Sequence, residues 1–262
     1  KWQFMFGGLM KVPMTIRAII GSGWGQGPQH SQSLQATFAH IPGLKVVMPS
    51  TPYSVKGLLI SSIWDDSPVI FLEHRRLYDL MGPVPEKLYN LPIGKGAIVR
   101  KGKDVTIAAI SYAVWDSIKA AVILKEEGID VEVIDLRTLK PLDEDIILES
   151  VRKTGRLVVA DTGWKSYGVS AEIAAIVAEK AFEYLKAPVR RVALPDVPSP
   201  TSVALEKAFY PSPFDIVSSV KQSIHGSTKM QSQSFPNAII TKDIFEKEFS
   251  NLSQKEEFLG PF

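Results

Sequence analysis

One histidine, His30, lies between a glycine-rich stretch and the start of a helical pattern. Apolar residues at helical spacing begin at Leu34 and recur at Phe38 and Ile41, so we expect a helix that starts at Ser31 and places His30 at its N-terminus. The positive end of a helix dipole disfavours an extra proton there, so such an imidazole tends to be neutral near pH 7. It could then accept or donate a proton, as chemistry on a carbonyl requires. An ordinary capping or surface histidine is the alternative interpretation.

The other three histidines have simpler interpretations. His40 falls near the predicted end of the same helix, where it can favour the negative end of the dipole. His74 follows an apolar run and Glu73, so a strand-end polar pair competes there with a role as base or ligand. His225 lies in a polar C-terminal segment, where we expect it to be solvated.

The composition is that of a globular protein with a sizeable core. The 262 residues are 45% hydrophobic and 22% charged, with a net charge of +2. Neither a nucleic-acid partner nor a membrane is expected, because no dense basic stripe and no apolar run of spanning length occurs. The chain has no cysteine, which excludes disulfides and thiolate catalysis. It does not begin with Met, so the numbering either starts inside a longer natural chain or follows a truncation.

Strands and helices alternate along most of the chain. Apolar runs separated by helical patterns favour parallel pairing through right-handed crossovers. The predicted fold class is α/β, with two three-layer α/β/α domains that carry largely parallel sheets. The predicted strands are 12–20, 44–48, 68–73, 105–111, 130–136, 156–161 and 189–194.

A segment rich in glycine and proline, 74–103, divides these elements into two series. We expect a boundary near residue 91. The predicted domains are 1–91, 92–222 and a polar C-terminal extension at 223–262, within which 239–252 has weak helical periodicity.

Two ordered sets of motifs run through these domains. The first half has QHSQS at 29–33, PGLKVV at 42–47, PSTP at 49–52 and KGL at 56–58. The second half has DLRTLKPLD at 135–143, AEIA at 171–174 and LPDVP at 194–198. In this order the motifs resemble the beta subunit of thiamine-diphosphate-dependent 2-oxo acid dehydrogenases of the pyruvate and branched-chain type, which are transketolase-like proteins.

The resemblance implies the second half of a pyrimidine-binding domain followed by a transketolase C-terminal domain. In that family the first domain begins well upstream of the position of Lys1, and the upstream part carries a glutamate that contacts the cofactor's aminopyrimidine ring. The diphosphate-binding pattern belongs to the alpha subunit. We therefore expect the residues that bind thiamine diphosphate and Mg²⁺ upstream of Lys1 and in an alpha-type partner.

Two sites on this chain follow from the resemblance. The family's corresponding histidine, His30 here, faces the active-site channel and assists proton transfer or steers a lipoyl group. Some beta subunits also bind a monovalent cation such as K⁺ through carbonyl groups and an aspartate in the loop before the strand at 68–73. The matching residues here are Ser62, Ile63 and Asp65, with Ser67 in place of a usual asparagine; a plain helix-terminating turn is the alternative.

The leading functional hypothesis is a beta-type subunit that decarboxylates a 2-oxo acid and passes the acyl group to lipoamide. It implies an alpha-type partner in an α2β2 heterotetramer, a lipoyl-bearing acyltransferase, and a location in the cytoplasm, or in a mitochondrial or plastid matrix. A split transketolase or carboligase subunit is one alternative. A non-catalytic assembly module left by truncation is another. The identity of the 2-oxo acid is not readable from these residues.

Overall fold

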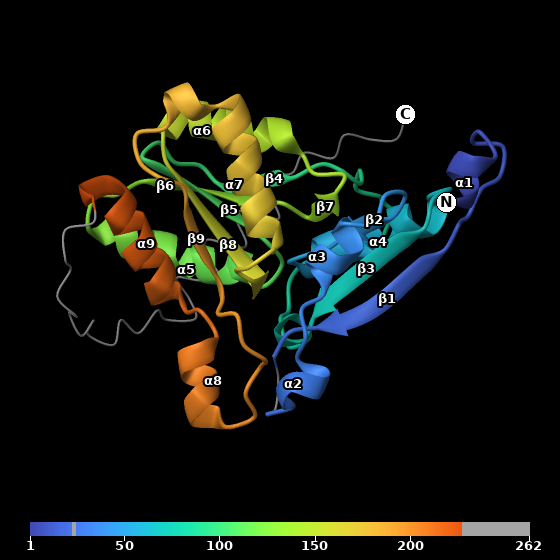
Figure 1. Ribbon diagram of the computed structural model, residues 1–262, viewed down its shortest axis with the longest axis horizontal. Coiled ribbons are helices and arrows are strands. Elements are labelled where there is room, and N and C mark those ends of the chain that lie inside the picture. Colours follow the sequence, from blue (N-terminus) through green and yellow to red (C-terminus); the bar gives the residue numbers. More distant parts are fainter. Residues whose placement is uncertain (23–24, 227–262) are drawn as a thin grey trace.

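The computed structural model describes residues 1–22 and 25–226, which form two mostly parallel β-sheets with helices packed against them (Figure 1). The predicted α/β class with largely parallel sheets is confirmed. Each predicted strand coincides with an observed one within a few residues. Among the described residues, no helix is long and apolar enough to cross a membrane.

The first sheet has the strand order β1-β3-β2-β7. β1 (Thr15–Ile20) and β2 (Lys45–Val47) both pair in parallel with β3 (Val69–His74). The fourth strand, β7 (Thr138–Lys140), comes from the second half of the chain and pairs antiparallel with β2. The predicted division near residue 91 is therefore crossed by one strand, and β1 is left with a neighbour on only one side within the described residues.

Four helices and a short 3₁₀ turn, η1, belong to the first half, and α3 and α4 contact this sheet. They are α1 (Trp2–Met5), α2 (Gly27–His30), α3 (Gln35–Ala39), α4 (Pro52–Trp64) and η1 (Arg75–Leu77).

The start of α4 is stabilised by a capping box. Thr51 is the N-cap, and its hydroxyl accepts a hydrogen bond from the Ser54 amide at 3.1 Å. The Ser54 hydroxyl accepts in turn from the Thr51 amide at 3.0 Å, and Pro52 occupies the first helical position, where no amide hydrogen is needed.

The predicted helix from Ser31 is wrong. The chain forms one turn of helix, α2, that ends at His30, and the next helix begins only at Gln35. Gly27 has a φ of +59° where α2 begins, and residues 31–34 are neither helix nor strand. The apolar spacing of Leu34 and Phe38 is real, but it marks α3 alone. The helix predicted at 239–252 lies outside the described residues.

The second sheet has the order β4-β6-β5-β8-β9. Its parallel strands are β5 (Val105–Ala109), β6 (Val131–Asp135), β8 (Leu157–Trp164) and β9 (Arg190–Leu194). The edge strand β4 (Ala97–Arg100) pairs antiparallel with β6 and lies in the segment predicted to be a connector.

Helices cover both faces of this second sheet (Figure 1). α5 and α9 pack together on one face, and α6 and α7 pack together on the other. The helical elements of this half are α5 (Ala113–Glu126), α6 (Glu144–Thr154), α7 (Val169–Lys180), the 3₁₀ turn η2 (Phe182–Tyr184), α8 (Val203–Phe209) and α9 (Pro213–His225).

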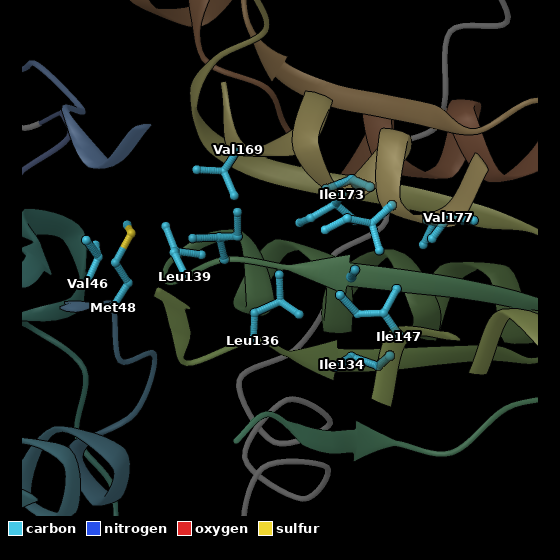
Figure 2. Close-up of a cluster of buried hydrophobic side chains, with 14 of the residues drawn as sticks. Val46, Met48, Ile134, Leu136, Leu139, Ile147, Val169, Ile173 and Val177 are labelled. Atoms are coloured by element: carbon cyan, nitrogen blue, oxygen red, sulfur yellow. The ribbon is translucent and has the colours of Figure 1, made fainter. Parts of the chain in front are cut away.

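One apolar core runs from the first sheet into the second. Val46 and Met48 lie next to Leu139 from β7, and the cluster continues through Leu136 towards Val169 on α7 (Figure 2). Burial of this apolar surface stabilises both halves together, because neither half buries its part of the cluster alone.

Replacing Gly21 by alanine should destabilise the protein more than the same change at Gly128. Both glycines have a φ of +78°, a backbone conformation that costs alanine about 1 kcal/mol. A Cβ at Gly128 would meet nothing within 4 Å, whereas a Cβ at Gly21 would lie 2.1 Å from His74 Nε2. We expect urea unfolding to show a loss of about 1 kcal/mol for Gly128→Ala and about 2–4 kcal/mol for Gly21→Ala. Equal losses would contradict the close approach of Gly21 to His74.

Candidate functional site

The candidate site lies where the strands of both sheets end. β1 and β3 are parallel, so their carboxyl ends, Ile20 and His74, lie at the same edge of the first sheet. This edge faces Asp161, which lies within β8, across a small cavity of about 40 Å³ that has room for a few water molecules. We call it the seam cavity. Ser22, His74 and Arg76 line it from the first half, and Tyr112, Asp116 and Asp161 line it from the second.

His74 is buried in the wall of the seam cavity. Its ring stacks on Tyr112 with 5.2 Å between ring centroids, and its Nδ1 accepts a hydrogen bond from the Arg76 amide at 3.3 Å. Burial, reinforced by the positive charges of Arg76 and Arg75, lowers the pKa of His74 to about 3. The imidazole is therefore neutral at pH 7 and joins the two halves of the chain as a packed aromatic ring.

Arg76 places a positive charge over two aromatic rings at this position. Its guanidinium lies 5.5 Å from the centroid of the Tyr112 ring and 5.1 Å from that of Tyr210. Asp116 is buried nearby, and burial raises the pKa of its carboxyl group although Lys119, at 3.2 Å, acts in the opposite direction. The seam cavity is thus lined by groups of both charges and by aromatic rings.

Asp161 is the most deeply buried acid of the site. Its carboxylate accepts hydrogen bonds from Gln35 Nε2 and the Gly163 amide, each at 2.9 Å, and from the Ser170 amide at 3.3 Å. Burial raises the pKa of Asp161, and these donors counteract that rise. Nothing in the local sequence around Asp161 indicated Gln35 as its partner.

His30 is the last residue of α2, and its side chain is exposed. The dipole argument for a neutral imidazole does not hold, because the residue lies at the carboxyl end of a helix and not at its N-terminus. The His30 carbonyl accepts a hydrogen bond from Arg75 Nη1 at 3.2 Å, while its imidazole makes no hydrogen bond within the described residues. The side chain is therefore available to a substrate or to a second chain.

The residues of the predicted cation site lie far from His30. Ser62 and Asp65 precede β3, at the opposite edge of the sheet from the carboxyl end of β1. The Ser62 carbonyl accepts a hydrogen bond from Thr15 Oγ1 at 2.8 Å, and Ile63 has a largely exposed side chain.

Asp65 already has a cationic partner. Lys45 Nζ lies 2.5 Å from its Oδ2, and the Ser67 amide donates to its Oδ1 at 2.8 Å. A K⁺ ion would have to displace Lys45, so this arrangement favours the ion pair over a bound cation. The K⁺ site stays a prediction.

A larger hollow of about 320 Å³ opens beside the start of α4. Lys56, which lines it, donates to the carbonyls of residues 85–87. Tyr78 donates to Glu73 at 2.9 Å, and burial raises its pKa to about 12. Both polar residues are thus held by other contacts of the chain.

The seam cavity is too small to be the site of thiamine diphosphate, whose ligands the family resemblance implies to lie upstream of Lys1 and in a partner chain. The seam cavity holds only a few water molecules, which is too little for a coenzyme of that size. In the described ranges, no three or more acidic or histidine side chains come together in a group that could hold a metal ion. The supply of these ligands by a partner chain stays a prediction.

Two family models match the chain in order. The transketolase pyrimidine-binding domain matches residues 2–81, and the transketolase C-terminal domain matches residues 94–216.

Full-length relatives match across both of these regions. The beta subunit of acetoin:2,6-dichlorophenolindophenol oxidoreductase from Cupriavidus necator is 48% identical over 226 residues, which cover 86% of this chain and 67% of the relative. The beta subunit of the pyruvate dehydrogenase E1 component from Rickettsia felis is 46% identical over 222 residues, which cover 85% and 68%. The chain thus spans about two thirds of these relatives.

A solved structure has a similar fold. It is described as a split-gene transketolase in an inactive beta4 tetramer, and it superposes with a TM-score of 0.67 at 24% identity. The alignment covers 86% of this chain and 71% of that one. At this identity the likeness shows the fold alone.

The neutral state of His74 should make stability depend on pH. Its folded-state pKa of about 3 lies below the ordinary value of 6.5, so between these pH values the unfolded chain binds a proton that the folded chain does not. Lowering the pH from 6.5 towards 3 should therefore cost up to about 1.4 kcal/mol of unfolding free energy per pH unit through this residue. His74→Phe should remove that part of the slope in urea titrations across this pH range.

Tyr112→Phe is the control, because it keeps the ring that stacks on His74 and should keep the wild-type slope. An unchanged slope in His74→Phe would show that His74 is not the group responsible.

Proposed function

Because the chain belongs to the family of transketolase-like beta subunits that includes those of pyruvate dehydrogenase and acetoin oxidoreductase, we propose that it is the beta-type subunit of a thiamine-diphosphate-dependent 2-oxo acid dehydrogenase. Together with an alpha-type partner it would decarboxylate a 2-oxo acid and pass the acyl group to lipoamide. The observation that carries this proposal is the identity of 46–48% to such subunits across both domains.

In this proposal the residues of the chain orient groups and move protons. Thiamine diphosphate, when bound, supplies the carbanion chemistry that side chains lack. His30 is the proton-transfer group that faces the active-site channel. Its exposed side chain at the end of α2 supports this role. His74 and Asp161 are too deeply buried to meet a substrate, and their part is to hold the two halves of the chain together.

An alpha-type partner would complete the site. The exposed edge of β1 supports a second chain, because its outer backbone groups are unpaired within the described residues and Ile16 and Ile19 expose about half of their surface. We propose an α2β2 heterotetramer that holds thiamine diphosphate with Mg²⁺ between its chains and works with a lipoyl-bearing acyltransferase. Its expected location is the cytoplasm, or a mitochondrial or plastid matrix in a eukaryote.

Acetoin is a second candidate substrate. The identity to the acetoin oxidoreductase subunit, 48%, is as high as that to the pyruvate dehydrogenase subunit. Both candidate substrates require the same cofactor chemistry next to a carbonyl group. The residues of the substrate pocket would therefore decide between them. The likeness to a split transketolase shows the fold alone and gives no separate support to a carboligase.

Co-expression with an alpha-type subunit tests the proposal. The purified complex is supplied with thiamine diphosphate, Mg²⁺ and a lipoyl domain, and turnover is measured with several 2-oxo acids and with acetoin. Turnover of 2-oxo acids that depends on thiamine diphosphate supports the main proposal, and turnover of acetoin alone supports the second. Transfer to an aldehyde acceptor without a lipoyl domain would indicate a carboligase, and a folded, inactive complex would indicate an assembly module.

Within this complex, His30→Ala should lower kcat about 10²- to 10⁴-fold, the usual contribution of a general acid or base. The unfolding free energy should stay close to that of the wild type, because the side chain is exposed. His40→Ala removes another exposed histidine only ten positions away, at the end of α3, and should leave kcat within about twofold. Wild-type turnover in folded His30→Ala would remove His30 from the mechanism.

A further inference from the structure

The segment that carries His30 has little regular structure of its own. Between Gly25 and Gln35 it contains only the single turn of α2, followed by four residues that are neither helix nor strand. From the first half, Arg75 holds it by bonds to the His30 carbonyl and to the side chain of Gln26. One of these hydrogen bonds is exposed to solvent and the other is half-buried, so both contribute little net stability.

The second half of the chain holds the same segment by a buried contact just beyond His30. Gln35 Nε2 donates to Asp161 Oδ1 at 2.9 Å, and both side chains are at least nine-tenths buried. A hydrogen bond to a buried carboxylate is among the stronger ones in proteins.

The acceptor in this contact is itself fixed. The Asp161 carboxylate, within β8, accepts hydrogen bonds from the amides of Gly163 in the same strand and of Ser170 in the first turn of α7. A Cβ at Gly163 would lie 2.5 Å from Gln35 Nε2, so the close approach of the two halves requires a glycine there.

Residues before α8 also hold the segment, on the N-terminal side of Gln35. Ser199 donates from its hydroxyl to the carbonyl of Ser31, the residue next to His30, at 3.2 Å. Thr201 fills the space beside Gly27, where a Cβ would lie 2.2 Å from Thr201 Oγ1. In Figure 1, α2 lies beside the chain that leads into α8, which is where residues 199 and 201 are found.

We propose that Gln35, Asp161, Ser199 and Thr201 are positioning residues that together fix the main chain on both sides of His30. We call these four residues the clamp. Through it the second domain sets the place of an imidazole that the first domain carries. The inference rests on the proposed proton-transfer role of His30, and it adds that this role depends on residues more than a hundred positions away in the sequence.

Gln35→Met tests the clamp, because it keeps an unbranched side chain of similar length while removing the donor to Asp161. Loss of a hydrogen bond to a buried charge should make amides 27–34 exchange with solvent about 10- to 100-fold faster. Hydrogen exchange followed by mass spectrometry on the full chain measures this without any need for activity.

Ser50→Ala is the matched control. Ser50 Oγ donates to the buried carboxylate of Asp135 at 2.5 Å, which is also a hydrogen bond from the first half to an aspartate of the second half. It lies beyond the end of β2, away from α2, and its loss should leave the exchange of amides 27–34 within about twofold of the wild type. Ser199→Ala is the second clamp variant, for use if Gln35→Met does not fold.

The alpha–beta complex supplies the functional test. Gln35→Met should lower kcat about tenfold and leave KM for the substrate unchanged, and it should lower kcat no further in a His30→Ala background. A general structural defect would lower kcat equally in both backgrounds, and that result would overturn the proposal.

The two proposals can fail separately. If the wild-type complex is inactive, the proposed function fails, while the exchange measurement still decides whether the clamp exists. Unchanged exchange of amides 27–34 in folded Gln35→Met and Ser199→Ala would overturn the clamp, as would faster exchange with wild-type kcat.

Discussion

The pairing of β7 with β2 is the constraint on which the rest of the structure depends. Through it a strand from the second half completes the sheet of the first half, and the Met48 amide donates to the Arg137 carbonyl at 2.8 Å next to the paired strands. The apolar core follows the same path from Val46 to Val169. Because the two sheets are tied together here, the carboxyl ends of β1 and β3 face Asp161 within β8, and the seam cavity exists.

Much of this fold could be predicted from local patterns. Apolar runs located the parallel strands, and the Thr51-Pro52 pair is itself a local signal for the start of α4, since caps and burial leave short-range signals. β7 and β4 have no such signal, because what makes them strands is a partner far away in the sequence. The helix predicted from Ser31 failed where distant residues make contacts: Ser199 donates to the Ser31 carbonyl, and Asp161 accepts from Gln35 at the start of α3.

The candidate site, like the fold, could be predicted only in part from local sequence patterns. The residue types of the QHSQS motif, with their family resemblance, were enough to select His30, but its position at the end of α2 and its supports were not readable. Asp161, Arg76 and Tyr112 become neighbours only when the two halves close. The cation site at Asp65 was predicted from a motif and stays a prediction, whereas the ion pair of Asp65 with Lys45 depends on a contact between β2 and the loop before β3 that no local pattern indicates. Tertiary contacts thus decide which motif residues stay free for chemistry.

The central claim is that the two sheets form one cooperative unit whose shared edge creates the site. The most direct test follows hydrogen exchange during urea unfolding in two peptides, one from β3 at 69–74 and one from β5 at 105–109. The structure predicts that both peptides lose protection at the same urea concentration, because the core and the β2–β7 pairing span the two halves. Loss of protection in β3 while β5 stays fully protected would contradict the claim.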